Sequence, residues 1–297
     1  MNMKYRVGQG SAVLAVVAVT TCVPLCAQHQ TEAVSPVVID GPLPYYLQLR
    51  VYDQDHSWLP TLHSFAQAQY DGKWLFLAGR TNGLHDLTRG GMMAFPTSAE
   101  NRDVWVIDPV TRQSWHRSLT DTSAQLNSYT VDSLSSTNTQ FYQAADRLYI
   151  TGGYGHRPGE GFKTFDTLTA IDVPGLIDWV QNGSGRAVDS ISQIRDPLFQ
   201  ITGGAKHHMG ELTHLVFGQN FAGPYNPFRE GIYAQQVRSV HIEDGPQGIS
   251  VTDVRSTTPD PDYRRRDLDV APTLRRDEDG EGLEPGLVAL SGVFTPD

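Results

Sequence analysis

Short apolar segments alternate with turns and polar loops over most of the chain. The segment Asp103–Asp108 alternates apolar and polar positions with a period of two, and Val, Ile, Trp and Tyr dominate it and its counterparts. This pattern is typical of half-buried antiparallel strands. No segment of comparable length shows a 3.6-residue period. Gly175–Gly183 is the nearest to one, and we expect either one helical turn there or a connection between a third and a fourth strand.

The order of these elements recurs four times. Each unit contains a strand, a tight turn, an apolar strand ending in glycine, a polar loop and an alternating strand. The apolar strands lie at 72–80, 148–155, 211–221 and 286–294. The glycines that align at their ends, Gly79, Gly153, Gly218 and Gly292, are 74, 65 and 74 residues apart. Glycine at a strand end allows the backbone to turn sharply. The expected structural glycines are Gly79, Gly152, Gly153, Gly218 and Gly292.

A four-stranded unit buries both of its faces when such units stack radially, as in a propeller. The glycine pair in Tyr149–Gly153 and the strand-to-tryptophan segment Val104–Trp115 resemble the kelch family. Three units depart from it, with Ala78, Phe217 and Ser291 in place of the first glycine. The resemblance implies an all-β, kelch-type β-propeller with about three and a half four-stranded antiparallel blades, as an open arc or partial propeller. A degenerate propeller of the WD or another type is the main rival.

The repeats predict a domain division. We expect a signal peptide at 1–28 and an N-terminal segment with a candidate blade-closing strand at 29–60. The propeller blades follow over 61–297, divided at 61–134, 135–190, 191–262 and an incomplete 263–297. A four-bladed protein and a piece of a larger propeller both fit this pattern. We favour the piece, because a chain that stops after an inner strand leaves an unpaired sheet edge.

The first 28 residues have the layout of a secretory signal. Lys4 and Arg6 precede an apolar stretch, Ser11–Cys26, and the small residue Ala27 follows it. A membrane anchor is the alternative, but the stretch is shorter than the roughly 20 residues that a spanning helix needs. We expect a secreted or periplasmic bacterial protein with no transmembrane segment in the mature chain. Lipoprotein anchoring fits poorly, since no small residue precedes either cysteine, at Thr21–Cys22 or Leu25–Cys26.

The composition argues against several kinds of function, namely cysteine-based chemistry and nucleic-acid binding. Both cysteines lie in the predicted signal peptide, so the mature chain has no disulfide, no cysteine nucleophile and no Cys-zinc site. The chain has 33 acidic and 23 basic side chains, a net charge of −10, and 39% hydrophobic residues. This composition suits a globular protein and gives no support to a nucleic-acid partner, whose binding surface would be basic.

Candidate binding residues concentrate in the polar loops. In kelch-type propellers the loops between second and third strands share one face with the segments between blades. Here these are 80–102, 154–165, 219–230 and Tyr263–Asp267. Their basic residues predict a cationic mouth that could take a carboxylate, a sulfate or an acidic sugar. The alternative is that the charges pair with Asp86, Glu160 or Asp267. The residues of the mouth are Arg80, His85, Arg89, His156, Arg157, Arg264, Arg265 and Arg266.

Metal and cofactor chemistry find little support in the sequence. His207, His208, Glu211 and His214 are close in sequence, but the repeat places the two adjacent histidines at a strand end, with side chains on opposite faces. We therefore expect no metal and no cofactor. The copper cofactor of galactose oxidase, which shares a kelch-type propeller, needs a cysteine that the mature chain lacks.

The resulting expectation is a binding or interaction module that takes a protein or an acidic glycan on its loop face. The alternative is a carbohydrate-active enzyme, an epimerase of the N-acetylneuraminate type or a lyase, because a periplasmic kelch-type epimerase acts on an acidic sugar. Fold class alone does not decide between them.

Overall fold

The computed structural model describes residues 56–83, 94–226, 229–277 and 279–296. The chain divides into two compact units, Met1–His56 and Ser57–Asp297, and nearly all of the described residues belong to the second. The predicted signal peptide and the candidate blade-closing strand up to residue 55 lie outside the described residues.

The first sheet contains four antiparallel strands in sequence order. These are β1 (Ala66–Tyr70), β2 (Lys73–Leu77), β3 (Asp103–Asp108) and β4 (Gln113–Ser118). Asp71 and Gly72 join β1 to β2 with φ values of 47° and 72°, which is the two-residue turn that matches the twist of a hairpin. The strand-turn-strand pattern predicted at the start of the first repeat is therefore confirmed.

The second sheet has the same strand order with two insertions. Its strands are β5 (Gln140–Ala144), β6 (Arg147–Thr151), β9 (Thr167–Asp172) and β10 (Ile191–Arg195). The loop after β6 carries a separate hairpin, composed of β7 (Tyr154–Arg157) and β8 (Gly161–Thr164).

Helix α3 (Val173–Asn182) separates β9 from β10 and ends at Gly183, whose φ is 71°. It lies where the sequence predicted a helical turn or a connection. Because α3 lengthens the connection, β10 pairs with β9 beyond the boundary that the repeat placed at residue 190. The second sheet therefore extends to Arg195.

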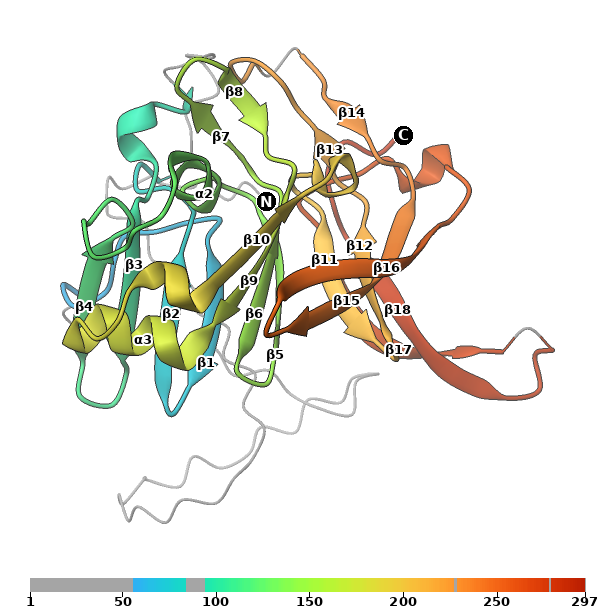
Figure 1. The fold of residues 1–297 in the computed structure, drawn as a ribbon. Helices are drawn as coiled ribbons and strands as arrows, with labels where there is room; N and C mark the ends of the chain where they lie inside the picture. The colour runs from blue at the N-terminus through green and yellow to red at the C-terminus, as the bar shows by residue number, and fades with distance from the viewer. Residues whose placement is uncertain (1–55, 84–93, 227–228, 278, 297) are drawn as a thin grey trace, which may run out of the picture. The chain divides into compact units, whose positions relative to one another are not determined.

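The third sheet repeats the order again, and a two-stranded sheet follows it (Figure 1). The third sheet contains β11 (Ala205–Met209), β12 (Leu212–Val216), β15 (Val237–Gly245) and β16 (Gly248–Ser256), with the short pair β13 (Gln219–Asn220) and β14 (Ile232–Tyr233) between β12 and β15. The last two strands are β17 (Asp269–Arg276) and β18 (Leu283–Leu290). Short 3-10 turns lie at Thr97–Ala99, Ala187–Ser190, Pro197–Phe199 and Pro261–Tyr263.

The described part of the chain is thus mostly β, built from several small antiparallel sheets that form no closed barrel. First strands of successive sheets contact one another, β1 with β5, β5 with β11 and β11 with β17. The helix α2 (Ser128–Leu134), between the first two sheets, has no counterpart among the sequence predictions.

The largest core lies between the first two sheets and is closed by α3. Trp179 and Leu176 of α3 are completely buried together with Leu75 of β2 and Ile171 of β9. The hydrophobic effect on burying such side chains contributes about 1.5–3 kcal/mol each. The core therefore fixes how the first and second sheets pack, and with them the loops at their ends.

The predicted structural glycines all have positive φ. Gly153 has φ of 98° and Gly152 has φ of 63°, a conformation that residues with a Cβ adopt at a cost. The corresponding glycines of the other three repeats show φ between 82° and 106°: Gly79, Gly218 and Gly292.

Candidate functional site

Three loops meet at one aromatic cluster at the upper end of the sheets (Figure 1). Phe95 comes from the loop after β2, Tyr154 and Phe162 from the β7–β8 hairpin, and Phe221 and Tyr225 from the loop after β12. All five rings are buried. The three loops that the sequence predicted to share a face therefore contact one another, and the cluster holds the polar side chains around it in place.

Arg80 lies inside this loop structure and is only 1% exposed. Its guanidinium stacks over the Phe95 ring at 5.0 Å and donates hydrogen bonds to the Asn82 Oδ1, at 3.1 Å, and to the Pro96 carbonyl. Burial lowers the pKa of Arg80, and the neighbouring Glu100 carboxylate offsets part of that effect. The Arg80 guanidinium is thus enclosed by the loop and bonded to it, and is not part of the molecular surface. His85 and Arg89 lie outside the described residues.

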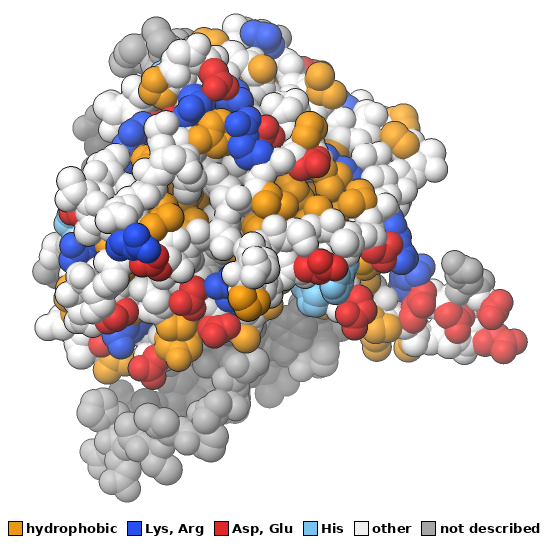
Figure 2. Space-filling model, in the orientation of Figure 1, with side chains coloured by type: hydrophobic (Ala, Val, Ile, Leu, Met, Phe, Trp, Pro, Cys, Tyr) orange, Lys and Arg blue, Asp and Glu red, His pale blue; other side chains and the backbone are white. Residues whose placement is uncertain are grey.

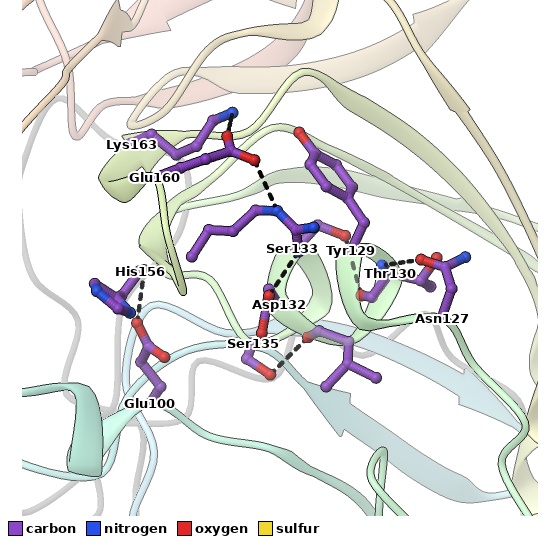
Figure 3. A network of polar contacts seen from close by, with 12 residues as sticks. Glu100, Asn127, Tyr129, Thr130, Asp132, Ser133, Ser135, His156, Glu160 and Lys163 are labelled. Carbon is purple, nitrogen blue, oxygen red and sulfur yellow. Dashed lines mark hydrogen bonds and ion pairs between the residues drawn. The ribbon is translucent and has the colours of Figure 1, made fainter.

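Helix α2 positions the centre of the polar network (Figure 3). Its N-cap is Asn127, whose side chain accepts a 2.9 Å hydrogen bond from the Thr130 amide, as Asn commonly does at a helix start. The helix carries Tyr129 and Asp132, and both side chains are nearly buried. Short as it is, α2 brings an aromatic ring and a carboxylate up to the β7–β8 hairpin.

Arg157 and Lys163 of that hairpin are held by carboxylates. Arg157 Nη1 lies 2.8 Å from Asp132 Oδ2, and its Nε lies 2.9 Å from Glu160 Oε1. Lys163 Nζ lies 2.7 Å from the other oxygen of Glu160. Both cations therefore share Glu160, whose side chain is 47% exposed, whereas that of Asp132 is 5% exposed.

Three cations surround the ring of Tyr129. Arg195 lies 3.8 Å from the ring centroid, Arg157 lies 4.6 Å from it and Lys163 lies 5.7 Å from it. A cation over the face of an aromatic ring is attracted by the ring quadrupole. The tyrosine hydroxyl donates a 2.5 Å hydrogen bond to Asp166. We call Tyr129, Arg157, Lys163 and Arg195 the tyrosine cluster.

Asp166 is the acid that bonds both Tyr129 and Arg195 of the tyrosine cluster. Burial alone would raise the pKa of Asp166, but hydrogen bonds from Arg195 and Tyr129 lower it below its ordinary value. Arg195 bonds both carboxylate oxygens at 3.1 Å, in the bidentate geometry that suits a guanidinium. The pKa of Tyr129 is raised, first by burial and then by its hydrogen bond to Asp166, so its hydroxyl keeps its proton.

His156 connects the β7–β8 hairpin to a further carboxyl group, that of Glu100. Its backbone N–H donates a 2.8 Å hydrogen bond to Glu100 Oε1. Burial raises the pKa of Glu100, and the His156 bond and the nearby arginines oppose the increase. Arg102 Nη2 lies 3.7 Å from Glu100 Oε2 and 3.4 Å from Asp132 Oδ1, so it joins the two acids.

The run of three arginines lies in a different cluster. Arg264 pairs with Glu230 at 2.5 Å and stacks over Tyr233 at 4.5 Å. Arg265 donates a 2.9 Å hydrogen bond to the Asp262 carbonyl. Arg266 lies 3.8 Å from Asp267 and stacks over Phe294 at 4.5 Å.

The geometry changes how the predicted cationic mouth is understood. Arg157 and Arg266 have the partners that the sequence left as the alternative, Glu160 and Asp267. Neighbouring acids therefore compensate the positive charge of Arg157 and Arg266. Figure 2 shows acidic side chains beside the basic ones over the β7–β8 hairpin.

Sequence reasoning missed the other half of the site. Tyr129 and Asp132 belong to a helix with no recognised period, and Arg195 fell in the range given to the next repeat. Lys163 belongs to the predicted loop 154–165 but was not selected. The one usable signal was Asn127 as a helix N-cap.

No group of three or more metal-ligating side chains occurs among the described residues. His207 and His208 lie within β11, and His207 is opposite His214 of β12 in the strand register. Burial lowers the pKa of His214. In the described part of the chain, no helix is long and apolar enough to cross a membrane.

Comparison with known proteins finds matches among the solved structures. No family model matches the chain, and no curated protein matches it. A solved structure titled "Structure of YjhT" aligns with a TM-score of 0.39 and 12% sequence identity. The alignment covers 76% of this chain and 66% of the other, so the chain spans about two thirds of that protein's length.

Proposed function

We propose that the chain is an exported kelch-type β-propeller protein that binds an acidic glycan on its loop face. The repeated strand order of three sheets and the two strands of a fourth support the propeller, with each sheet as one blade. The sequence pattern of the first 28 residues supports export to the periplasm or the medium. The expected partner class was a protein or an acidic glycan, and the tyrosine cluster favours the glycan.

One observation carries this choice. Three cations surround a single ring, and the acid that Arg157 and Lys163 share is the most exposed of the acids bonded to the cluster. Glu160 is 47% exposed, so solvent screens its ion pairs in part, although Arg157 and Lys163 are each only 20% exposed. A carboxylate or sulfate on a sugar would therefore compete with Glu160 for these two cations. Arg195, 53% exposed, would contribute a third contact.

A binding titration with defined acidic oligosaccharides tests the proposal. The probes are oligogalacturonate and a chondroitin sulfate oligosaccharide, with neutral dextran as the comparison. We expect the full chain to bind at least one acidic probe, and Arg157→Met or Lys163→Met to weaken binding by about tenfold, or 1.4 kcal/mol. Glu160→Gln should strengthen it, because the internal competitor has lost its charge.

The matched control is Arg186→Met. Arg186 forms an ion pair with Asp189 three residues away, the same spacing as Arg157 and Glu160, but it is more exposed and lies outside the tyrosine cluster. This control should bind as the unmodified chain does, and binding should weaken as salt rises. Equal binding of dextran, or equal losses in Arg186→Met and Arg157→Met, would overturn the proposal.

The second candidate is a carbohydrate-active enzyme of the epimerase or lyase type. It is favoured by Glu100, a buried carboxyl group whose pKa is raised by burial, as expected for a general acid. Proton NMR of N-acetylneuraminate and oligogalacturonate incubated with the chain tests this candidate. A turnover that disappears in Glu100→Gln supports it, and unchanged spectra, or turnover that survives in this variant, oppose it.

A further inference from the structure

A cleft lies beside the first sheet, at the end where the loop from β2 returns to β3. Its volume is about 400 Å³, within the range of roughly 300–1,000 Å³ that is usual for small-molecule sites. It is lined mainly by the segment 97–105 and by residues 60–62 in front of β1. The tyrosine cluster is not part of its lining.

One aromatic ring lines the cleft and is held in position from outside it. Trp105 of β3 stacks on His116 of β4, with ring centroids 4.4 Å apart and an angle of 22° between the planes. His116 Nδ1 in turn lies 3.0 Å from Asp103 Oδ2. His116 does not line the cleft, so it supports the indole on another side. A ring fixed in this way offers apolar surface at a low entropic cost.

The polar lining suits an uncharged ligand with several hydroxyl groups. The lining includes two carboxyl groups, Glu100 and Asp103, and one guanidinium, Arg102. Arg102 lies 3.7 Å from Glu100 and 3.4 Å from Asp132 outside the cleft, so its charge is already shared with acids, which disfavours an anionic ligand. The exposed hydroxyl-bearing residues Thr97 and Ser98 add groups that both donate and accept hydrogen bonds.

We infer that this cleft binds a neutral pyranose ring. The ring's C–H face packs on Trp105, and its hydroxyls bond to the Asp103 carboxylate and the Arg102 guanidinium, which accept and donate respectively. Seven of the eleven lining residues carry a charged group or a hydroxyl, which favours a ligand with both an apolar face and several polar groups. The inference goes beyond the proposed acidic-glycan site, since it concerns residues outside the tyrosine cluster and an uncharged ligand.

Saturation-transfer NMR and titration of the tryptophan indole N–H signals test it on the full chain. The probes are methyl β-D-glucopyranoside, methyl β-D-galactopyranoside and methyl α-D-mannopyranoside, each raised to about 50 mM, a concentration that would saturate a site of millimolar Kd. We expect at least one glycoside to shift the Trp105 indole signal saturably. Trp105→Ala and Asp103→Ala should each weaken its binding by about tenfold or more.

Two further variants separate this inference from a folding effect and from the proposed function. Trp74→Phe alters another half-buried tryptophan, on β2 of the same sheet and outside the cleft, and should leave the affinity unchanged. Arg157→Met should also leave it unchanged, although it weakens binding of acidic glycans. Trp105→Phe keeps a ring and should retain part of the affinity. Failure of all three glycosides to bind, or equal losses in Trp74→Phe and Trp105→Phe, would overturn the inference.

Discussion

The backbone amide of Gly153, at the end of β6, donates a 2.9 Å hydrogen bond to the carbonyl of Ile201, which precedes the first strand of the next sheet. The same bond recurs in two other repeats, so the second strand of each of these three repeats ends against the backbone of the following repeat. Close approach of two backbones leaves no room for a side chain. The equivalent pairs are Gly79 with Ser136, at 2.8 Å, and Gly218 with Arg265, at 3.2 Å.

The neighbouring position gives the first prediction. A Cβ on Gly152 would lie 1.9 Å from the Ile201 oxygen, and its φ of 63° is unfavourable for alanine. We expect Gly152→Ala to lower the free energy of unfolding by about 3 kcal/mol or more, because conformational strain and a backbone clash add. Urea denaturation followed by circular dichroism measures the loss.

Gly72→Ala is the matched control for this prediction. Its φ of 72° is similar, but no atom lies within 4 Å of the position of its Cβ. Only conformational strain remains there, so the loss should be about 1–2 kcal/mol. If both variants lose the same stability, the contact with Ile201 has no part in the effect.

The repeat could be predicted from the sequence because turns and apolar strands are local patterns. The hairpin at Asp71–Gly72 and the apolar strand after it follow from two adjacent residues and a period. The backbone conformation repeats more regularly than the residue types at these positions suggest. Ala78, Phe217 and Ser291 replace the first glycine of the pair, yet their φ values of 61°, 56° and 58° match the 63° of Gly152. Surrounding backbone contacts therefore impose this conformation where the sequence has no glycine.

The tyrosine cluster could not be predicted in the same way. Tyr129, Lys163 and Arg195 are separated by more than 30 residues in sequence. The packing of α2 against β7 brings Lys163 to Tyr129, and Arg195 reaches the same ring from the end of β10. A sequence shows which arginines are present, but it does not show which carboxylates lie close to them in the folded chain. The partners of Arg157, Asp132 and Glu160, come from two different elements, and one of these elements was not expected.

A salt bridge between the second and third sheets gives the next prediction. Arg147 Nε and Nη2 bond the two oxygens of Asp244 at 2.7 and 2.6 Å, and Tyr149 donates a 3.0 Å hydrogen bond to the same carboxylate. The Asp244 side chain is 10% exposed. A double-mutant cycle of Arg147→Met and Asp244→Asn should give a coupling energy of about 1–2 kcal/mol, since charge-assisted bidentate pairs of low exposure exceed surface pairs.

The control pair has the same geometry on an exposed strand. Arg255 and Asp253 of β16 bond at 2.7 and 2.6 Å, with side chains 65% and 44% exposed. Solvent screens this pair, so its coupling energy should be below about 0.5 kcal/mol. Equal coupling in the two cycles would show that burial between the sheets does not strengthen the Arg147–Asp244 bridge.

A buried lysine gives the last prediction. Lys206 of β11 is 3% exposed and donates a 2.8 Å hydrogen bond to Thr151 Oγ1, while the rings of Tyr142 and Tyr149 lie 5.3 and 5.8 Å from its Nζ. Burial lowers the pKa of Lys206 well below its ordinary value. The folded state therefore binds fewer protons than the unfolded chain between this lowered pKa and about 10.4, the pKa of an unfolded lysine.

The sign of the pH dependence follows from this difference. Through that pH range the contribution of Lys206 to stability increases as pH rises, because the unfolded chain loses the proton that favoured it. Lys206→Met should be more stable than the unmodified chain at pH 7, by about 1–3 kcal/mol. The advantage should shrink toward pH 10.5, and urea denaturation at pH 7, 9 and 10.5, all below about 11 so that arginine stays charged, measures it. Lys73→Met, at a half-buried position on β2, should show no such trend. A constant advantage for Lys206→Met at all three pH values would show that Lys206 is not deprotonated by folding.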